Sequence, residues 1–125
     1  MIHGIGTDIV RVARMSEALA RHGARFAERI LDMSERPAFE QVRDPARMLS
    51  KRFAAKEAFG KALGTGVAAP ATLHAVRVAH DTLGKPLFEL APALAAYMQE
   101  RGLVAHLSLS DETDYVVAFA VIEKP

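Results

Sequence analysis

Residues 45–66, PARMLSKRFAAKEAFGKALGTG, are the most strongly helical stretch of the chain, and the other elements are expected to pack around them. Asp44 can cap the first turn, and Pro45 suits the first helical position. Gly64 and Gly66 are natural stops for the helix. Apolar residues recur on one side of this helix and predict that it is buried: Met48, Leu49, Phe53, Phe59, Ala62 and Leu63.

Ahead of this helix the sequence predicts one strand and several short helices. Residues 2–10 are apolar with glycines at Gly4 and Gly6, which is typical of a short buried strand that another backbone approaches closely. Residues 11–31 change to helical spacing, which Gly23 should interrupt. Ser34, followed by Pro37, predicts a further short helix with a serine cap.

The chain after the long helix is richer in strands. Four elements are predicted there: a hairpin over residues 74–90 that turns at Asp81–Lys85, a helix over 92–101, an alternating strand over 104–110 and an apolar strand over 115–123. The last of these is expected to be central because it is apolar almost throughout. The order of elements predicts a single α+β domain over residues 1–125, with a largely antiparallel sheet packed against one long and several short helices.

Composition limits the functions that this chain can have. Half of its 125 residues are hydrophobic and a quarter are charged, as in ordinary globular domains. It has no cysteine, which excludes disulfides, thiolate catalysis and cysteine zinc sites. No apolar run is long enough to span a bilayer, and the N-terminal MIHGIGTDIV lacks the pattern of a signal peptide. We therefore expect a cytoplasmic protein without a membrane partner. A chain of 125 residues has a single small core, so its site is expected at the surface or between subunits.

Charge is segregated along the chain, although the formal net charge is only +1. Residues 43–61 contain six basic and two acidic side chains, and residues 11–29 contain five arginines and two glutamates. Such basic stretches indicate an anionic ligand or partner, and the alternative is a solvated helix face. Nucleic-acid binding is the weaker interpretation because there is no Trp, few aromatic residues and no known motif.

Two acids and a lysine are the candidates for chemistry. Glu57 and Lys61 lie four residues apart and share a helix face, which is also the spacing of an ordinary stabilising pair. Small and apolar residues flank Glu57 in the sequence, so this part of the helix is not expected to be a freely solvated face. Asp8 is embedded in the apolar strand of residues 2–10, where an acid is costly unless something pairs with it or it caps the next helix. Together Asp8 and Glu57 offer two hard oxygen ligands, which suit Mg²⁺.

The segments GIGTDIV (residues 4–10) and KRFAAKEAFGKALGTG (residues 51–66) resemble the bacterial holo-[acyl-carrier-protein] synthases, a branch of the phosphopantetheinyl transferases. RFAERIL, Gly84-Lys85-Pro86, HLSLSDE and the closing YVVAFAVIE support the resemblance in the family's order. One departure is Asp111, where many members have histidine. The resemblance implies the phosphopantetheinyl transferase fold, a homotrimer with sites between subunits, and transfer of phosphopantetheine from coenzyme A to a serine of an acidic acyl carrier protein in fatty-acid biosynthesis.

The resemblance also implies roles for individual residues. Asp8 and Glu57 would bind Mg²⁺, and Lys61 would reach the coenzyme A phosphates; these three are the expected catalytic residues. Glu57 is the hypothetical base, directly or through a bound water. The expected coenzyme-binding residues, some of them from a neighbouring subunit, are Arg52, Gly64, Gly84, Lys85, Pro86, His106 and Ser108. For Arg52 and Lys56 the role considered is phosphate binding or helix positioning. The expected carrier-binding residues are Arg14, Arg21 and Arg25.

A non-catalytic nucleotide- or anion-binding module with the same fold is the alternative. Such a module would keep the basic helices but would not need Asp8, Glu57 and Lys61 together. Their joint presence favours an enzyme.

Overall fold

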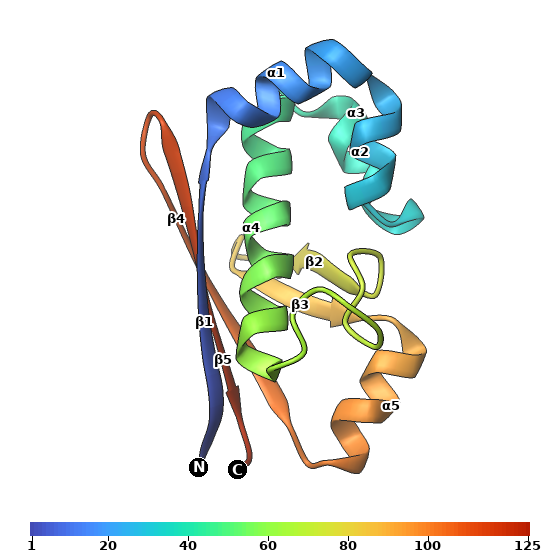
Figure 1. Ribbon diagram of the computed structural model, residues 1–125, viewed down its shortest axis with the longest axis vertical. Helices are drawn as coiled ribbons and strands as arrows, with labels where there is room; N and C mark the ends of the chain where they lie inside the picture. Colours follow the sequence, from blue (N-terminus) through green and yellow to red (C-terminus); the bar gives the residue numbers. More distant parts are fainter.

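The computed structural model describes residues 1–125 and has a three-stranded antiparallel sheet, a separate two-stranded hairpin and a long central helix. Figure 1 shows the three-stranded sheet along one side of this helix and the short helices near its two ends. The fold is therefore α+β with antiparallel sheets, as predicted. The elements in chain order are β1 (Ile2–Arg11), α1 (Val12–His22), α2 (Ala24–Ile30), η1 (Met33–Glu35), α3 (Arg36–Gln41), α4 (Pro45–Leu63), β2 (Val76–His80), β3 (Pro86–Leu90), α5 (Pro92–Glu100), β4 (Val104–Asp111) and β5 (Tyr115–Glu123).

Helix α4 begins and ends as its sequence predicts. The Asp44 carboxylate accepts a hydrogen bond of 3.1 Å from the Arg47 amide, and Pro45 occupies the first turn. Gly64 ends the helix with φ 97°, a left-handed conformation that glycine adopts without a steric penalty. The end of the helix is thus set by local sequence.

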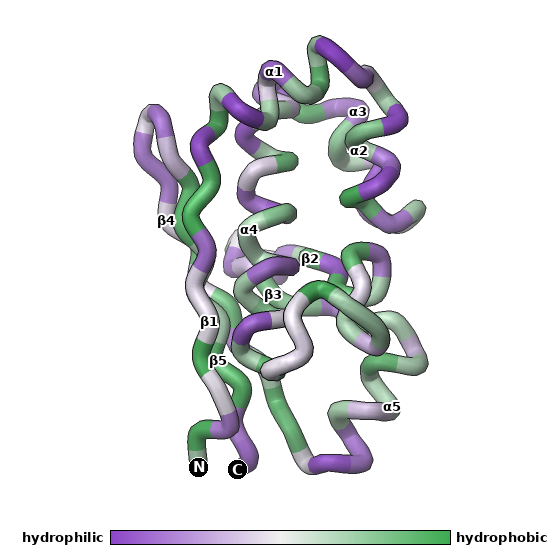
Figure 2. The backbone as a smooth tube through the Cα atoms, viewed as in Figure 1, coloured by the Kyte–Doolittle hydropathy of each residue, from purple (hydrophilic) through white to green (hydrophobic).

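The strands of the main sheet are ordered β1-β5-β4, so the apolar strand over 115–123 is central, as predicted. Its alternate residues Val116, Ala118, Ala120 and Ile122 are buried, on the face that packs against α4. The other face carries apolar side chains that nothing in the chain covers, such as Phe119, Ile5 and Ile9, the last being 63% exposed. Figure 2 shows the hydrophobic segments along β1 and β5.

Strand β1 is therefore only half buried, which corrects the prediction of a buried strand. Gly6 and Val10 are its buried residues. The apolar pattern was compatible with two covered faces, but in this chain α4 covers one face and the other face is left open.

Two glycines let β1 approach α4 very closely. A Cβ at Gly4 would lie 2.0 Å from the Ala62 carbonyl oxygen, and a Cβ at Gly6 would lie 2.1 Å from the Ala58 carbonyl oxygen. Both distances are shorter than any real contact, so only glycine fits. This approach brings Asp8, two residues beyond Gly6 on the same face of the strand, against the middle of α4.

The connections differ from prediction at one point. Gly23, with φ 63°, separates α1 from α2 as expected, and Gly84 with φ 88° lies in the Asp81–Lys85 turn. Ser34, however, is not the cap of a helix. Asp32 caps η1 instead, accepting from the Ser34 amide while the Glu35 side chain accepts from the Asp32 amide. None of the helices is both long enough and apolar enough to cross a membrane.

Candidate active site

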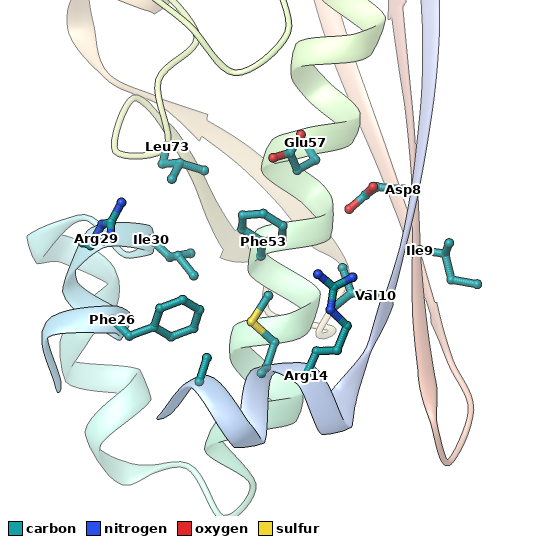
Figure 3. Close-up of a pocket in the computed structure, with 12 residues that line it drawn as sticks. Asp8, Ile9, Val10, Arg14, Phe26, Arg29, Ile30, Phe53, Glu57 and Leu73 are labelled. Carbon is teal, nitrogen blue, oxygen red and sulfur yellow. The ribbon is translucent and has the colours of Figure 1, made fainter. Parts of the chain in front are cut away.

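Asp8 and Glu57 face the same cavity, although they lie far apart in the sequence. The cavity has a volume of about 540 Å³ and is bordered by β1, α1, α2 and α4. Asp8 reaches it from the inner face of β1, and Glu57 from the side of α4 (Figure 3). Arg14 extends from α1 into the space near Asp8. The structure thus brings the two predicted carboxylates together.

Lys61 lies beside the same pair. Its Nζ donates to the Thr7 carbonyl oxygen at 2.9 Å and lies 3.5 Å from Asp8 Oδ1. The side chain is 53% exposed, so its ammonium group can move toward a ligand at the mouth of the site. Asp8, Glu57 and Lys61 therefore form one cluster, held by the close packing of β1 on α4.

Both carboxyl groups are easier to protonate than ordinary acids. Partial burial raises the pKa of Asp8, and Lys61 only partly opposes this effect. Partial burial also raises the pKa of Glu57, and the negative charge of Asp8 raises it further, against the influence of Lys61. The two carboxylates thus repel each other across the cavity, and a cation between them would relieve this repulsion.

The donor set fits a magnesium ion better than a transition metal. Asp8 and Glu57 supply hard oxygen donors, and the molecule contains no group of three or more His, Cys, Asp or Glu side chains that could hold a metal. Mg²⁺ needs only one or two carboxylates when waters and substrate phosphates complete its coordination.

The remainder of the cavity is mostly apolar and has two arginines. Phe26, Ile30 and Phe53 line it, and Figure 3 shows Arg29 at its far side from Asp8. Of the three arginines predicted to contact the carrier, Arg14 borders this cavity, whereas Arg21 and Arg25 are exposed outside it. Arg29 was not among the predicted site residues. Arg29 lies three residues after Phe26, and residues at this spacing share a helix face. This spacing was the sequence signal that could have placed Arg29 on the same side of α2 as Phe26.

Arg52 and Lys56 do not border the Asp8–Glu57 cavity. Lys56 is fully buried and donates to Glu35 Oε1 and the Leu73 carbonyl oxygen, both at 2.6 Å. Arg52 is 7% exposed and donates to Glu35 Oε2 at 3.0 Å and to the Val78 carbonyl oxygen at 2.7 Å. Both hydrogen bonds of Lys56 are made inside the fold, which favours helix positioning over phosphate binding for this residue. Glu35 was not among the predicted site residues: the Asp32–Glu35 spacing is the local signal of a capping box, but nothing in the sequence pairs Glu35 with α4.

Arg52 instead borders a second pocket, of about 300 Å³. Its other basic residues are Arg43, Arg47, Lys51 and His80. His80 pairs with Pro86 across the hairpin, so this pocket lies beside the strand ends that carry Gly84, Lys85 and Pro86. Asp111, the departure noted in the sequence, lies 3.3 Å from Arg47 and 3.6 Å from Lys51, and partly neutralises this basic group.

His106 and Ser108 lie elsewhere again, on the uncovered face of the sheet. Their neighbours Ala105, Leu107 and Leu109 take the inner positions, as the alternation predicted, and His106 Nε2 lies 2.9 Å from Glu123 Oε2. Gly64 lies at the end of α4. None of the predicted coenzyme-binding residues borders the Asp8–Glu57 cavity within one chain.

Similarity to known proteins agrees with this arrangement. The family model of the 4′-phosphopantetheinyl transferase superfamily matches residues 4–120. A holo-[acyl-carrier-protein] synthase of Aromatoleum aromaticum is 71% identical over 124 residues, which cover 99% of each chain. The structure of a holo-[acyl-carrier-protein] synthase from Neisseria meningitidis matches with a TM-score of 0.95 and 47% identity, covering 99% of this chain and 100% of the other. A holo-(acyl-carrier-protein) synthase from Bacillus anthracis, in complex with CoA (3′,5′-ADP), matches with a TM-score of 0.85 and 32% identity, covering 100% of this chain and 99% of the other. Over nearly its whole length, therefore, the chain belongs to the 4′-phosphopantetheinyl transferase superfamily.

Proposed function

We propose that this protein transfers the 4′-phosphopantetheine group of coenzyme A to a serine of an apo acyl carrier protein, in support of fatty-acid biosynthesis. The products are the holo carrier and adenosine 3′,5′-bisphosphate. The observation that carries this proposal is that Asp8 and Glu57 line one cavity, with Lys61 beside Asp8. The relatives' name and the CoA complex of the Bacillus anthracis protein support the same substrate pair.

Asp8 and Glu57 would hold Mg²⁺, which when bound supplies positive charge to offset that of the coenzyme A pyrophosphate. Lys61, one helical turn beyond Glu57, would contact the same phosphates and stabilise the charge that grows on the leaving bisphosphate. Its exposed ammonium group can leave Thr7 and Asp8 to do so.

The transfer itself is a displacement at phosphorus. The carrier serine oxygen forms a bond to the phosphorus that bears pantetheine, and the bond from that phosphorus to the bridging oxygen of the bisphosphate breaks. The serine proton passes to the Glu57 carboxylate, directly or through a bound water. The apolar wall around Phe26 and Phe53 would limit the access of water.

The carrier would dock on α1 and α2. Arg14, Arg21 and Arg25 give these helices a basic surface suited to an acidic partner, and Arg29 adds to it at the cavity. Docking there would deliver the carrier serine to the side of the cavity where Asp8 and Glu57 lie.

A homotrimer would complete the site. Within one chain the Asp8–Glu57 cavity is separate from Arg52, the hairpin turn, His106 and Ser108, so these residues fit the adenosine end of coenzyme A only if a neighbouring copy supplies them. The uncovered apolar face of β1, β5 and β4 supports such an assembly, because exposed patches of this kind are typical of interfaces. Phe119→Glu places a charge on this face, so the variant should sediment as a monomer and should not transfer phosphopantetheine. A variant that remains trimeric and active would contradict this interface.

The decisive test is to incubate the protein with coenzyme A, Mg²⁺ and an apo carrier and to weigh the carrier by mass spectrometry. The proposal predicts a gain of one phosphopantetheine group that requires Mg²⁺. Asp8→Ala and Glu57→Ala should each abolish the gain without unfolding the protein. Binding of coenzyme A without any gain of carrier mass, with carriers from several pathways, would favour the non-catalytic alternative.

A further inference from the structure

We infer that Glu35 is a positioning residue for the active site: it holds Arg52 and Lys56, and through them sets the rotation of α4 that presents Glu57 and Lys61 to Asp8. This inference rests on the proposed function, since it concerns how the metal-binding pair is held. Glu35 lies in η1, outside both the cavity and the basic pocket, so it would touch neither the metal nor a substrate.

One carboxylate joins three parts of the fold. Glu35 Oε2 accepts from Arg52 at 3.0 Å and from the Val78 amide of β2 at 3.1 Å. Glu35 Oε1 accepts from Lys56 at 2.6 Å and from the Asp32 amide at 3.0 Å. No buried side-chain nitrogen or oxygen lacks a partner, so the cluster is fully satisfied. Fully satisfied buried networks fix a single arrangement of the elements they join.

The geometry of a helix carries this constraint to the active site. Arg52 and Lys56 are four residues apart and form one stripe of α4, while Phe53, Glu57 and Lys61 form the next stripe around the helix. A rotation that moved Lys56 away from Glu35 would also displace Glu57 relative to Asp8. Lys56 additionally holds the carbonyl of Leu73, a residue that borders the cavity.

Apolar packing also restrains α4, since Leu49, Phe59 and Leu63 are buried on it beside several alanines. The Glu35 cluster adds charge-assisted hydrogen bonds of defined direction to this packing. Buried ion pairs are often no more stabilising than apolar residues of the same volume, so orientation is the more fitting role for this cluster.

The experiment compares Lys56→Met and Glu35→Gln with Ser50→Ala, a matched control. Ser50 is also buried on α4, but its hydroxyl donates only to the Ala46 carbonyl of the same helix. Thermal unfolding gives the folded fraction, and electron paramagnetic resonance gives the affinity for Mn²⁺ as a probe of the metal site, without coenzyme A. We expect each cluster variant, while folded, to bind Mn²⁺ at least tenfold more weakly and to show a raised KM for coenzyme A. Ser50→Ala should bind Mn²⁺ as the wild type does.

A purely structural role would lower the thermal midpoint but leave the Mn²⁺ affinity of the folded protein unchanged, and that result would overturn the inference. If the single variants do not fold, the triple variant Glu35→Met/Arg52→Met/Lys56→Met decides, because it removes every charge of the cluster. A folded triple variant with weakened Mn²⁺ binding supports the inference, whereas unchanged binding or failure to fold overturns it.

Failure of the proposed function would look different. In that case the wild type would give no gain of carrier mass with coenzyme A and Mg²⁺, whether or not it bound Mn²⁺. Mn²⁺ binding that Asp8→Asn does not weaken would overturn the inference, because the metal would not lie at the proposed pair. The positioning inference alone fails when the wild type modifies the carrier and binds Mn²⁺ through Asp8, and folded cluster variants bind Mn²⁺ equally well.

Discussion

Replacing Gly6 by alanine tests whether the close approach of β1 to α4 builds the active site. The new Cβ would lie 2.1 Å from the Ala58 carbonyl oxygen and 2.9 Å from the Lys61 Cβ. Real Cβ contacts essentially never fall below 3.0 Å, so the strand and helix must separate by about 0.9 Å or more. Overpacking of this kind costs roughly 1–3 kcal/mol, or about 5–15 °C in the thermal midpoint of a domain this size.

The separation of β1 from α4 should lower the rate of phosphopantetheine transfer more than it lowers the stability of the fold. Asp8 follows Gly6 by two residues on the same face of β1, and displacements near 1 Å in a catalytic site can cost about 100-fold in rate. The carrier mass-shift assay, run as a time course below the thermal midpoint, measures that loss. Gly4→Ala is the matched control: its Cβ would lie 2.0 Å from the Ala62 carbonyl oxygen, but Gly4 is four residues from Asp8. Gly6→Ala activity within twofold of wild type, or an equal loss in Gly4→Ala at equal stability, would refute the reasoning.

Three further predictions concern charge at the site. Asp8→Asn and Glu57→Gln should each raise the thermal midpoint at pH 7, because ionisation of a group whose folded pKa is raised destabilises the fold. The gain should disappear as the pH falls below the ordinary pKa of each group, 3.8 for Asp8 and 4.5 for Glu57, and a gain that is independent of pH would contradict this. Lys61→Met should lower kcat/KM for coenzyme A by roughly 10–100-fold, the value of one charge-assisted hydrogen bond, with little change in the thermal midpoint, since the side chain is half exposed. Arg14→Glu should raise the KM for the carrier and make this KM less dependent on ionic strength. Arg101→Glu, at the end of the distant α5, should leave both the KM and its salt dependence unchanged. Equal effects of the two variants would argue against docking at α1.

The elements of the fold were largely predictable because their signals are local. The Asp44 cap, the Gly64 stop, the Asp81–Lys85 turn and the alternation of β4 each depend on residues within a few positions of one another. Ser34 was the exception. Asp32, two residues earlier, takes the cap because its carboxylate and the Glu35 side chain form a reciprocal pair of hydrogen bonds.

The site was predictable to a smaller extent. Asp8, Glu57 and Lys61 were found as an acid within an apolar strand and an acid–lysine pair on a helix, and the structure brings them together. The resemblance implied a phosphate or helix-positioning role for Arg52, which within one chain borders a different pocket and donates to Glu35. Which side of α4 a basic residue faces depends on what packs there, and that is a property of the whole fold.

The sequence by itself determined most helix and strand limits, Ser34 excepted, and which residue types could hold a cation and phosphates. Only the tertiary structure decided that Gly6 lets Asp8 line the same cavity as Glu57, that Glu35 pairs with two basic residues of α4, and that one face of the sheet remains uncovered. The physical reason is the range of the interactions. Caps, turns and periodicity act within a few residues, whereas close backbone contact, buried charge pairing and burial join residues that are far apart in the chain.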